Sequence, residues 1–445
     1  MDTSETKTPH LITLPKPHVA LFSTADRGGA GIAAMRLQSG LRHLGMPSVA
    51  YVQYKVTTQE HIFVLPPASD DAIVAYGEGG CALSSVSKNI HIQQRALSAY
   101  PDRPRHCEMF SSSEATTRLG AVPWPDEPDL LHFHWIASFL DIPADTSFLR
   151  GKKIVWTLHD MNPFTGGCHY ADGCDGFLQQ CGRCPQLASN QDNDLSRRTW
   201  KRKNYAYRNL DITVVTPSRW LAEEARKSSL LGRFPVHCIP NGVPQDIFKP
   251  YPKATLRESV GIPPDGNALL FSADNLLNRR KGLAWLLEAL HLLHDSPEAQ
   301  NLTLLLLGNG GEQIHQLPWP VKNLGHLTNP TALAAAYGAA DAVVLPSQED
   351  NLPNVLTEAL ACGIPAVAFH VGGIPDILEH ERTGWLAKPR DAADLAEGLR
   401  WALTPQPARN RLCRARAMEK FSLKKCAAAY EALYTSLLGG KVVSF

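Results

Sequence analysis

The chain has 445 residues, 44 Lys and Arg against 43 Asp and Glu, and a hydrophobic fraction of 44%. This length predicts two domains, and the formal net charge of +1 gives no electrostatic case for nucleic acid as the main partner. No apolar run approaches the roughly 20 residues that a membrane span needs, although a helix lying on a bilayer surface stays possible.

The amino-terminal region reads as a polar tail followed by a strand, a glycine-rich turn and a helix. Residues 1–16 have neither a positively charged start nor an apolar signal core, so we interpret them as a disordered tail and the protein as cytoplasmic. Residues 18–22 predict a buried strand, and a helix is expected around Ala33–Leu44. The turn Asp26–Gly31 between them is rich in glycine, which lets the backbone approach a phosphate. The dinucleotide fingerprint is incomplete there, so nicotinamide chemistry is not favoured.

Further apolar runs in the first half predict strands at residues 48–54, 129–135, 153–159, 211–217 and 236–240. His132 and His134 alternate along one run and therefore share one face of its strand. Acceptor binding and structural hydrogen bonding are equally compatible with that pattern. His159 and Asp160 close another run, and the carboxyl end of a parallel strand faces the ligand cleft of such sheets. Many histidines in that position only cap a sheet.

Four cysteines crowd into one short loop with the spacing C-x5-C-x6-C-x2-C: Cys168, Cys174, Cys181 and Cys184. Four sulfurs suffice for a tetrahedral zinc site, and because four thiolates leave no open position for substrate, such a zinc would be structural. The alternatives are two disulfides or plain thiols, and a reducing cytoplasm argues against the disulfides. We interpret the cluster as a structural zinc site.

The second half repeats the pattern of the first. Apolar runs predict strands at residues 267–274, 302–308, 322–327, 341–347 and 365–370, with helices near Leu283–Leu293, Thr331–Ala339 and Ser422–Leu438. Continuous Val, Ile and Leu runs are typical of parallel strands buried on both faces. We therefore expect two doubly wound, Rossmann-like α/β domains, residues 17–245 and 246–421, with ligands in the cleft between them. Residues 422–445 would form a helix that packs back on the first domain.

Two polar segments of the second half lie between a predicted strand and a predicted helix, where sheets of this type bind ligands. The basic turn Asn278–Gly282 lies between a predicted strand and a predicted helix, where fixed cations could stabilise a departing diphosphate, although such clusters are often merely solvated. In the segment Pro346–Gly363 a strand ends in an acidic loop, and a helix begins near Pro353. Asp350 lies in the loop and Glu358 about two turns into the helix, so two carboxylates are available for sugar and ribose hydroxyls.

The segment Pro346–Gly363 resembles the signature of the family 4 retaining glycosyltransferases, in which two glutamates stand eight positions apart. Residues 324–347 and 364–387 continue the match, so the resemblance covers the second domain almost throughout. It implies the GT-B fold, two Rossmann-like domains facing across a cleft, and points to bacterial exopolysaccharide enzymes of the colanic-acid type.

The resemblance assigns donor-binding roles by position. In the family the first acid contacts the donor sugar and the second the ribose, which implies Asp350 and Glu358. Aspartate replaces glutamate at the first position and Glu349 precedes it, so which acid touches the sugar stays open. Asn351 and Leu352 complete the donor loop.

The same resemblance indicates which residues would supply positive charge to the diphosphate. Lys281 matches the family lysine, whereas the family arginine falls on Leu276, so Arg280 or Arg279 is expected to substitute for it. In the first domain, Gly29 and Gly31 would lie nearest the diphosphate.

The resemblance also gives a role to the histidine that closes the run at 153–159. His159 inherits a hydrogen bond to the donor sugar near the reacting carbon. Asp160 would orient this histidine or contact the acceptor.

These features predict a retaining hexosyltransferase that moves a sugar from a UDP- or GDP-sugar to a glycan or lipid-linked glycan without a catalytic metal. Asp350, Lys281, Arg280 and His159 would carry the chemistry. A nucleotide-sugar epimerase of the same fold and a catalytically degenerate sugar-binding subunit are the alternatives. No nucleic acid partner is expected, and loose attachment to the inner face of a membrane stays possible.

Overall fold

The computed structural model describes residues 18–65, 83–104, 106–122, 124, 127–314 and 317–439, so the expected tail lies outside the described residues. The strands are β1 Val19–Ala25, β2 Ser48–Tyr54, β3 Ile62–Val64, β4 Leu130–Phe133, β5 Lys153–Thr157, β6 Asp211–Thr216, β7 Val236–Cys238, β8 Asn267–Asn275, β9 Leu302–Asn309, β10 Val321–Gly325, β11 Ala342–Leu345, β12 Ala366–Phe369 and β13 Gly384–Ala387. The α-helices are α1 Gly28–His43, α2 Leu83–Ser98, α3 Thr146–Leu149, α4 Leu195–Tyr207, α5 Arg219–Lys227, α6 Lys253–Val260, α7 Leu283–Leu293, α8 Pro330–Ala339, α9 Asn354–Ala361, α10 Ile374–Ile377, α11 Ala392–Leu403, α12 Pro407–Lys420 and α13 Leu423–Leu437. Short 3-10 turns connect several of these elements.

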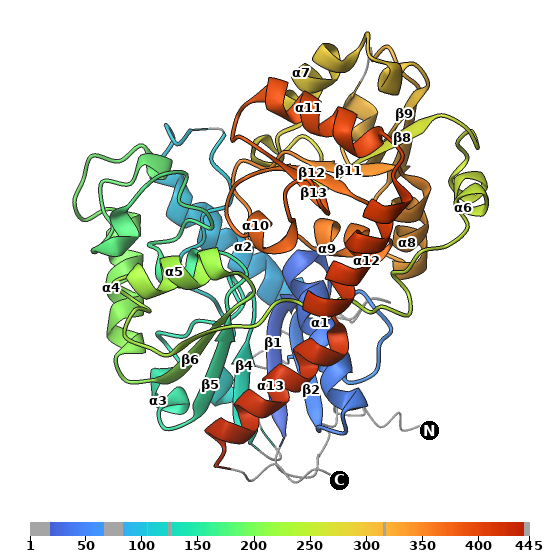
Figure 1. Ribbon diagram of the computed structural model, residues 1–445. Coiled ribbons are helices and arrows are strands. Elements are labelled where there is room, and N and C mark those ends of the chain that lie inside the picture. The colour runs from blue at the N-terminus through green and yellow to red at the C-terminus, as the bar shows by residue number, and fades with distance from the viewer. Residues whose placement is uncertain are drawn as a thin grey trace, which may run out of the picture. The chain divides into compact units, whose positions relative to one another are not determined.

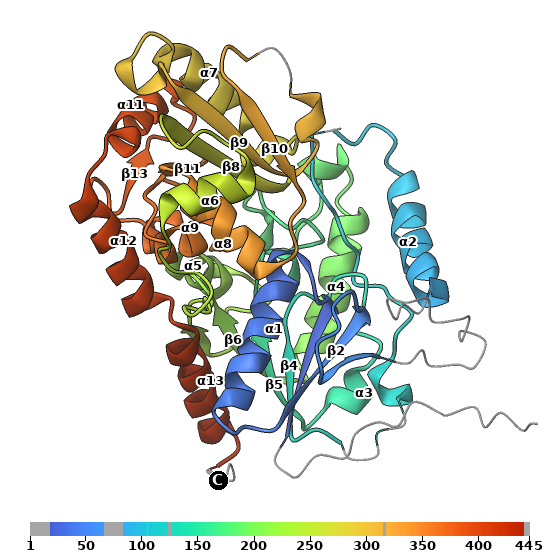
Figure 2. The same cartoon turned by 90° about the vertical axis from the view of Figure 1, so that its right-hand side faces the viewer.

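The first sheet has seven strands in the order β3-β2-β1-β4-β5-β6-β7. From β3 to β6 the neighbouring strands pair in parallel. The strand order reverses between β1 and β4, so the loops after these two strands leave the sheet at a topological switch point. Helix α1 packs along β1 and β2 (Figures 1 and 2).

The second sheet has six strands in the order β10-β9-β8-β11-β12-β13, all paired in parallel. Alternate residues of its strands enter two separate cores. Leu269 and Phe271 pack with α7 and α11, whereas Ala268 and Leu270 pack with α8, α9 and α12. Helices on both faces explain the continuous apolar runs of the sequence, and the expected doubly wound fold is confirmed.

The chain divides into two compact units, one formed by residues 1–215, 227–236 and 428–445, the other by residues 216–226 and 237–427. The carboxyl-terminal part of α13 thus belongs to the first unit. There Tyr430 Oη lies 2.7 Å from Thr157 Oγ1, and Tyr434 Oη lies 2.7 Å from His132 Nδ1. The domain boundary that the sequence predicts, after residue 245, stays a prediction.

Candidate functional site

The acidic segment of the second unit lies where β11 ends and α9 begins. Asp350, Asn351, Leu352 and Glu358 are all nearly buried, at 6%, 3%, 6% and 4% exposure. Because α9 begins at Asn354, Glu358 is its fifth residue and lies little more than one turn into the helix, not two turns as the sequence suggested.

Asp350 is the centre of a buried ion cluster. Lys281 Nζ donates a hydrogen bond of 2.6 Å to Asp350 Oδ2, and Arg280 Nη1 lies 3.6 Å from the same oxygen. Ser347 Oγ donates to this oxygen as well, at 3.2 Å. Arg280 Nη1 also donates to the backbone carbonyl of Glu349, at 2.7 Å. The structure therefore brings two cations to Asp350.

The charge of Asp350 is maintained by its neighbours. Burial acts to raise the pKa of the Asp350 carboxyl, but Lys281 and Arg280 outweigh it and hold the pKa below its usual value. The carboxylate is therefore ionised at neutral pH, and two positive groups face one negative group. A ligand phosphate arriving beside Asp350 would therefore find two cations already in place.

The basic turn is ordered by its own backbone. Asn278 caps it by accepting from the Arg280 amide at 2.9 Å, and the Gln348 amide donates to the Arg280 carbonyl at 2.7 Å. Arg280 is half-buried against Asp350, whereas Arg279 is exposed. Leu276, where the family resemblance would place an arginine, is fully buried in the apolar core. Of the two candidate arginines, Arg280 is the one that the structure brings to the acidic cluster.

Glycines allow the close approach of three loops in this region, which sequence reasoning did not identify. Gly282 has φ +80°, and a Cβ there would lie 1.9 Å from the Pro346 carbonyl oxygen. A Cβ on Gly373 would lie 1.9 Å from the Asn351 carbonyl oxygen. Ser218 Oγ donates to Asn351 Oδ1 at 2.6 Å, which fixes the side chain of that loop residue. The one feature of the sequence that could have indicated this close packing is the pair Gly372-Gly373 after β12.

In the first unit, three histidines at the ends of β4 and β5 lie together, of which His132 and His134 are buried and His159 is half-buried. His132 is fully buried, and its ring nitrogens lie 2.7 Å from Thr157 Oγ1 and 2.7 Å from Tyr434 Oη. These surroundings match the structural role among the two that the sequence left open. His134 Nδ1 lies 2.9 Å from His159 Nε2, so these two rings share a hydrogen bond.

Asp160 is enclosed by hydrogen-bond donors. Its Oδ2 accepts from Trp135 Nε1 at 2.6 Å and interacts with His169 Nδ1 at 2.6 Å, while Oδ1 accepts from the Asn162 amide at 2.9 Å. At 7% exposure both carboxylate oxygens are occupied within the unit. This arrangement suits an orienting role beside His159 better than contact with an acceptor.

The histidine cluster predicts a loss of stability in mild acid. Burial lowers the pKa of His159 from 6.5 to about 4, and it lowers the pKa values of His132 and His134 well below 6.5. Between pH 6.5 and 4 the unfolded chain thus binds more protons than the folded one, and stability falls as pH falls. Each histidine contributes up to about 1.4 kcal/mol per pH unit. Urea unfolding at pH 7 and pH 5 measures this, and we expect a shallower pH dependence in His159→Gln but not in a variant of the exposed His237. An unchanged slope in His159→Gln would contradict the prediction.

The glycine-rich turn opens α1. Gly28 has φ +70°, and Gly29 is exposed at the start of the helix. A Cβ on Gly31 would lie 2.3 Å from the Ala25 carbonyl oxygen, so this glycine allows the helix to pack against the end of β1. Asp26 is buried and accepts from the Val56 and Thr57 amides. The turn is thus held in place by the segment that follows β2, and Gly28 and Gly29 are its exposed glycines.

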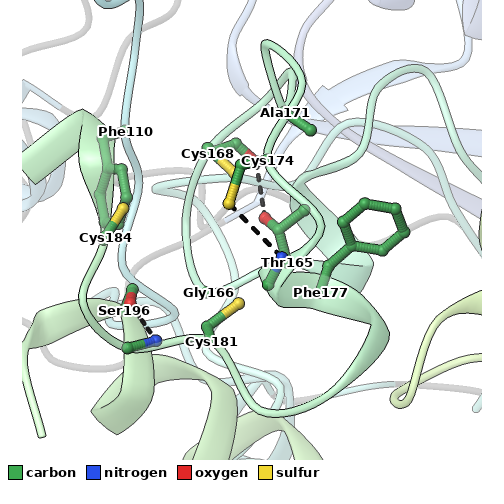
Figure 3. A pocket seen from close by; sticks show the side chains of 12 residues that line it. Phe110, Thr165, Gly166, Cys168, Ala171, Cys174, Phe177, Cys181, Cys184 and Ser196 are labelled. Atoms are coloured by element: carbon green, nitrogen blue, oxygen red, sulfur yellow. Dashed lines mark hydrogen bonds between the residues drawn. The ribbon is translucent and has the colours of Figure 1, made fainter. Parts of the chain in front are cut away.

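The four cysteines of the 168–184 loop line one small cavity (Figure 3). All four are free thiols rather than disulfides. Burial raises the pKa of Cys181 to about 12 and that of Cys184 to about 11, so both thiols are protonated. The volume within the cavity that the centre of a water molecule can occupy is about 20 Å³. The cavity can therefore hold one small ligand such as a water molecule. Within the described ranges, no group of three or more His, Cys, Asp or Glu side chains is arranged to hold a metal ion.

Comparison with known families matches both halves of the chain. Residues 68–246 match the model described as Glycosyltransferase Family 4, and residues 267–404 match the model described as Glycosyl transferases group 1. Between them these two segments cover most of the chain.

No helix among the described residues is long and apolar enough to cross a membrane.

One curated relative agrees with the family match. WcaC of Escherichia coli K12, a glycosyl transferase provisionally assigned to colanic acid biosynthesis, is 28% identical over 57% of this chain and 62% of its own length. The match therefore spans somewhat less than two thirds of that relative.

Two solved structures share the fold. Sucrose-phosphate synthase from Thermosynechococcus elongatus superposes with a TM-score of 0.63 at 19% identity, covering 96% of this chain and all of that one. HepE of Anabaena in complex with UDP-glucose superposes with a TM-score of 0.60 at 17% identity, covering 94% and 99% of the two chains.

Proposed function

Because this chain belongs to the family 4 and group 1 glycosyltransferases, we propose that it transfers a hexose from a nucleotide sugar to a glycan or lipid-linked glycan, with retention at the anomeric carbon. The observation that carries the proposal is the buried cluster in which Lys281 and Arg280 meet Asp350 at the start of α9. It provides fixed positive charge beside a carboxylate, as departure of a nucleoside diphosphate requires.

The second unit would bind the donor. The leaving diphosphate gains negative charge as the glycosidic bond breaks, and Lys281 with Arg280 would stabilise it. Asp350, already ionised, accepts hydrogen bonds and would exchange part of its contact with Lys281 for a sugar hydroxyl. Glu358, buried on α9, would accept the ribose hydroxyls. These cations and the helix terminus would perform the work that a bridging metal does in other transferases.

His159 of the first unit would act at the sugar. Its ring is neutral at pH 7 because burial lowers its pKa to about 4, so it serves as a hydrogen-bond partner rather than a cation. An acceptor hydroxyl attacking on the face that the diphosphate leaves would give retention.

The first experiment is calorimetric titration of the purified protein with UDP, GDP and ADP without added metal. UDP leads because a protein of the same fold is known with UDP-glucose bound. Binding of one nucleotide supports the donor site and selects the donor class, and release of that nucleotide in the presence of acceptor glycans completes the support. No binding by any of the three would remove the donor-site assignment.

Two other outcomes would replace the proposal. Conversion of the donor to its epimer without an acceptor would identify an epimerase. Nucleotide binding without turnover across a panel of acceptors would identify a sugar-binding subunit.

We also propose that the cysteine loop takes up zinc as a structural ion. Four thiols around one cavity supply enough ligands, and their side chains would have to rotate toward a common centre. Because binding displaces thiol protons, the affinity should rise with pH. Metal analysis of protein purified without chelator is expected to give about one zinc per chain, and to give none for Cys181→Ser. An equal metal content in both proteins would contradict this role.

Attachment to a membrane face is proposed from the exposed side of α4. Arg198, Lys201, Tyr205 and Arg208 are all exposed, and their spacing of three and four residues places them on one face of the helix. Basic side chains with an aromatic ring suit an anionic lipid surface. Co-sedimentation with vesicles is expected to require anionic lipid and to weaken in an Arg198→Glu, Lys201→Glu variant. Equal sedimentation of both proteins would contradict the proposal.

A further inference from the structure

Three side chains of the first unit form a buried hydrogen-bonded line that ends at the residue after His159. His169 Nδ1 lies 2.6 Å from Asp160 Oδ2, and His169 Nε2 lies 2.9 Å from Ser111 Oγ. Ser111, His169 and Asp160 are 1%, 4% and 7% exposed. His169 belongs to the cysteine loop, directly after Cys168, whereas Asp160 directly follows His159.

The order of residues is that of a serine hydrolase triad, but the surroundings exclude that chemistry. A nucleophilic serine needs access to substrate and oxyanion donors about 3 Å from the reacting atom. Ser111 instead is closed in by its own backbone contacts: its amide donates to the Gly167 carbonyl at 2.8 Å, and Asn162 Nδ2 donates to its carbonyl at 3.3 Å. A serine at 1% exposure is a support, not a nucleophile.

The line fixes the orientation of Asp160. Burial acts to raise the pKa of the Asp160 carboxyl, but its interaction with His169 and its hydrogen bonds with Trp135 and the Asn162 amide outweigh burial and hold the pKa below its usual value. An ionised Asp160 accepts the Nδ1 proton of His169, which leaves Nε2 as the atom that meets the Ser111 hydroxyl. The Met161 amide also donates to the His169 carbonyl at 2.9 Å. His169 thus holds the backbone on one side of Asp160 and the carboxylate itself.

From this geometry we propose that His169 is a positioning residue for His159, and that the cysteine loop serves to hold the sugar-contacting end of β5 in place. The inference rests on the proposed transferase function. Asp160 links the two histidines, because it is hydrogen-bonded to His169 and follows His159 directly in the chain. Releasing Asp160 would let the turn after β5 shift, and a misplacement of about 1 Å at a reacting group lowers the rate by about 100-fold.

The test compares two substitutions at one position. Asparagine presents an amide N–H close to the place of the imidazole Nδ1–H and can keep the bond to Asp160, whereas phenylalanine cannot. We expect His169→Phe to lower kcat by about 10- to 100-fold while the affinity for the nucleotide, bound by the second unit, changes less than twofold. His169→Asn should restore kcat to within about fivefold of the parent. Gln179→Ala, an exposed position in the same loop, is the matched control and should leave both quantities unchanged.

Several outcomes would overturn the inference. Equal kcat in the parent and His169→Phe would do so, as would equal losses in the phenylalanine and asparagine variants, because either result removes the link through Asp160. Hydrolysis of p-nitrophenyl acetate that is lost in Ser111→Ala would show instead that the line is nucleophilic.

A readout without turnover separates this inference from the proposed function. The ring nitrogen resonances of His159, assigned with His159→Gln, should shift in His169→Phe and return toward the parent in His169→Asn. If the parent shows no transfer but these resonances behave as expected, the proposed function fails and the positioning role stands. Unshifted resonances overturn the positioning role in either case.

Discussion

Replacing Lys281 by alanine is expected to lower kcat/KM for sugar transfer by about 100- to 1000-fold. Removal of one preorganised group that stabilises developing negative charge has this effect on other enzymes. Lys281 is held in place by Asp350 at 2.6 Å in a nearly buried setting, so it is ordered before the donor binds. Steady-state kinetics with the nucleotide sugar selected by titration measure the effect. A change of less than about threefold would remove the lysine from the reaction.

The neighbouring arginines give matched controls for this experiment. Arg280 contacts Asp350 and the Glu349 carbonyl, whereas Arg279 is exposed. Arg280→Ala should therefore cost at least about tenfold in kcat/KM, as one charge-assisted contact is worth about 1.5–3 kcal/mol, and Arg279→Ala should cost little. Because Lys281→Ala removes the nearer of the two cations that face the buried Asp350, it should also lower stability. Lys281→Arg keeps the positive charge beside Asp350 and should therefore keep most of the stability. A loss of kcat/KM in this variant can then be assigned to the reaction and not to unfolding.

Replacing Glu358 by alanine is expected to weaken nucleotide binding by about 10- to 100-fold. Hydrogen bonds to a charged group contribute about 1.5–3 kcal/mol, and 1.4 kcal/mol corresponds to a tenfold change in Kd. Glu358 is 4% exposed, so its carboxylate is ordered by packing before a ribose arrives. Calorimetric titration of the variant with the preferred nucleotide measures the loss.

Two comparisons make the Glu358 result specific. Glu358→Gln preserves the shape and one acceptor, and we expect it to lose less affinity than the alanine variant. Glu288→Ala changes an exposed glutamate on α7 and should leave affinity unchanged. Unaltered affinity in Glu358→Ala would assign the buried glutamate to folding rather than to the ribose.

Much of the architecture was predictable because the local spacing of apolar residues determines which segments form strands and helices. Runs such as residues 302–308 are apolar except for Thr303, and only a strand covered by helices on both faces buries every side chain of such a run. Helix α7 occupies the predicted residues Leu283–Leu293. The short strands β3 and β13 were not predicted, because three or four residues at a sheet edge have too little pattern to stand out from a loop.

The sequence by itself placed the acidic segment at the end of a strand, the basic turn before a helix, and four cysteines in one loop. Only the tertiary structure decided which of these groups meet. Lys281 and Asp350 are separated by 69 positions, and the selection of Arg280 over Arg279 depends on the direction in which the turn leaves β8.

The same limit holds for the histidines and for Asp160. Alternation placed His132 and His134 on one face, but Tyr434, 302 positions away, decides that His132 is a fully occupied core residue. Ser111 and His169 carry no signal toward Asp160 in the sequence, since the three meet only when separate loops pack together. Local sequence sets the period and the ends of each element through backbone and side-chain preferences that act over a few residues. The partners of each polar group are set by the order of strands and the packing of loops, which depend on the whole chain.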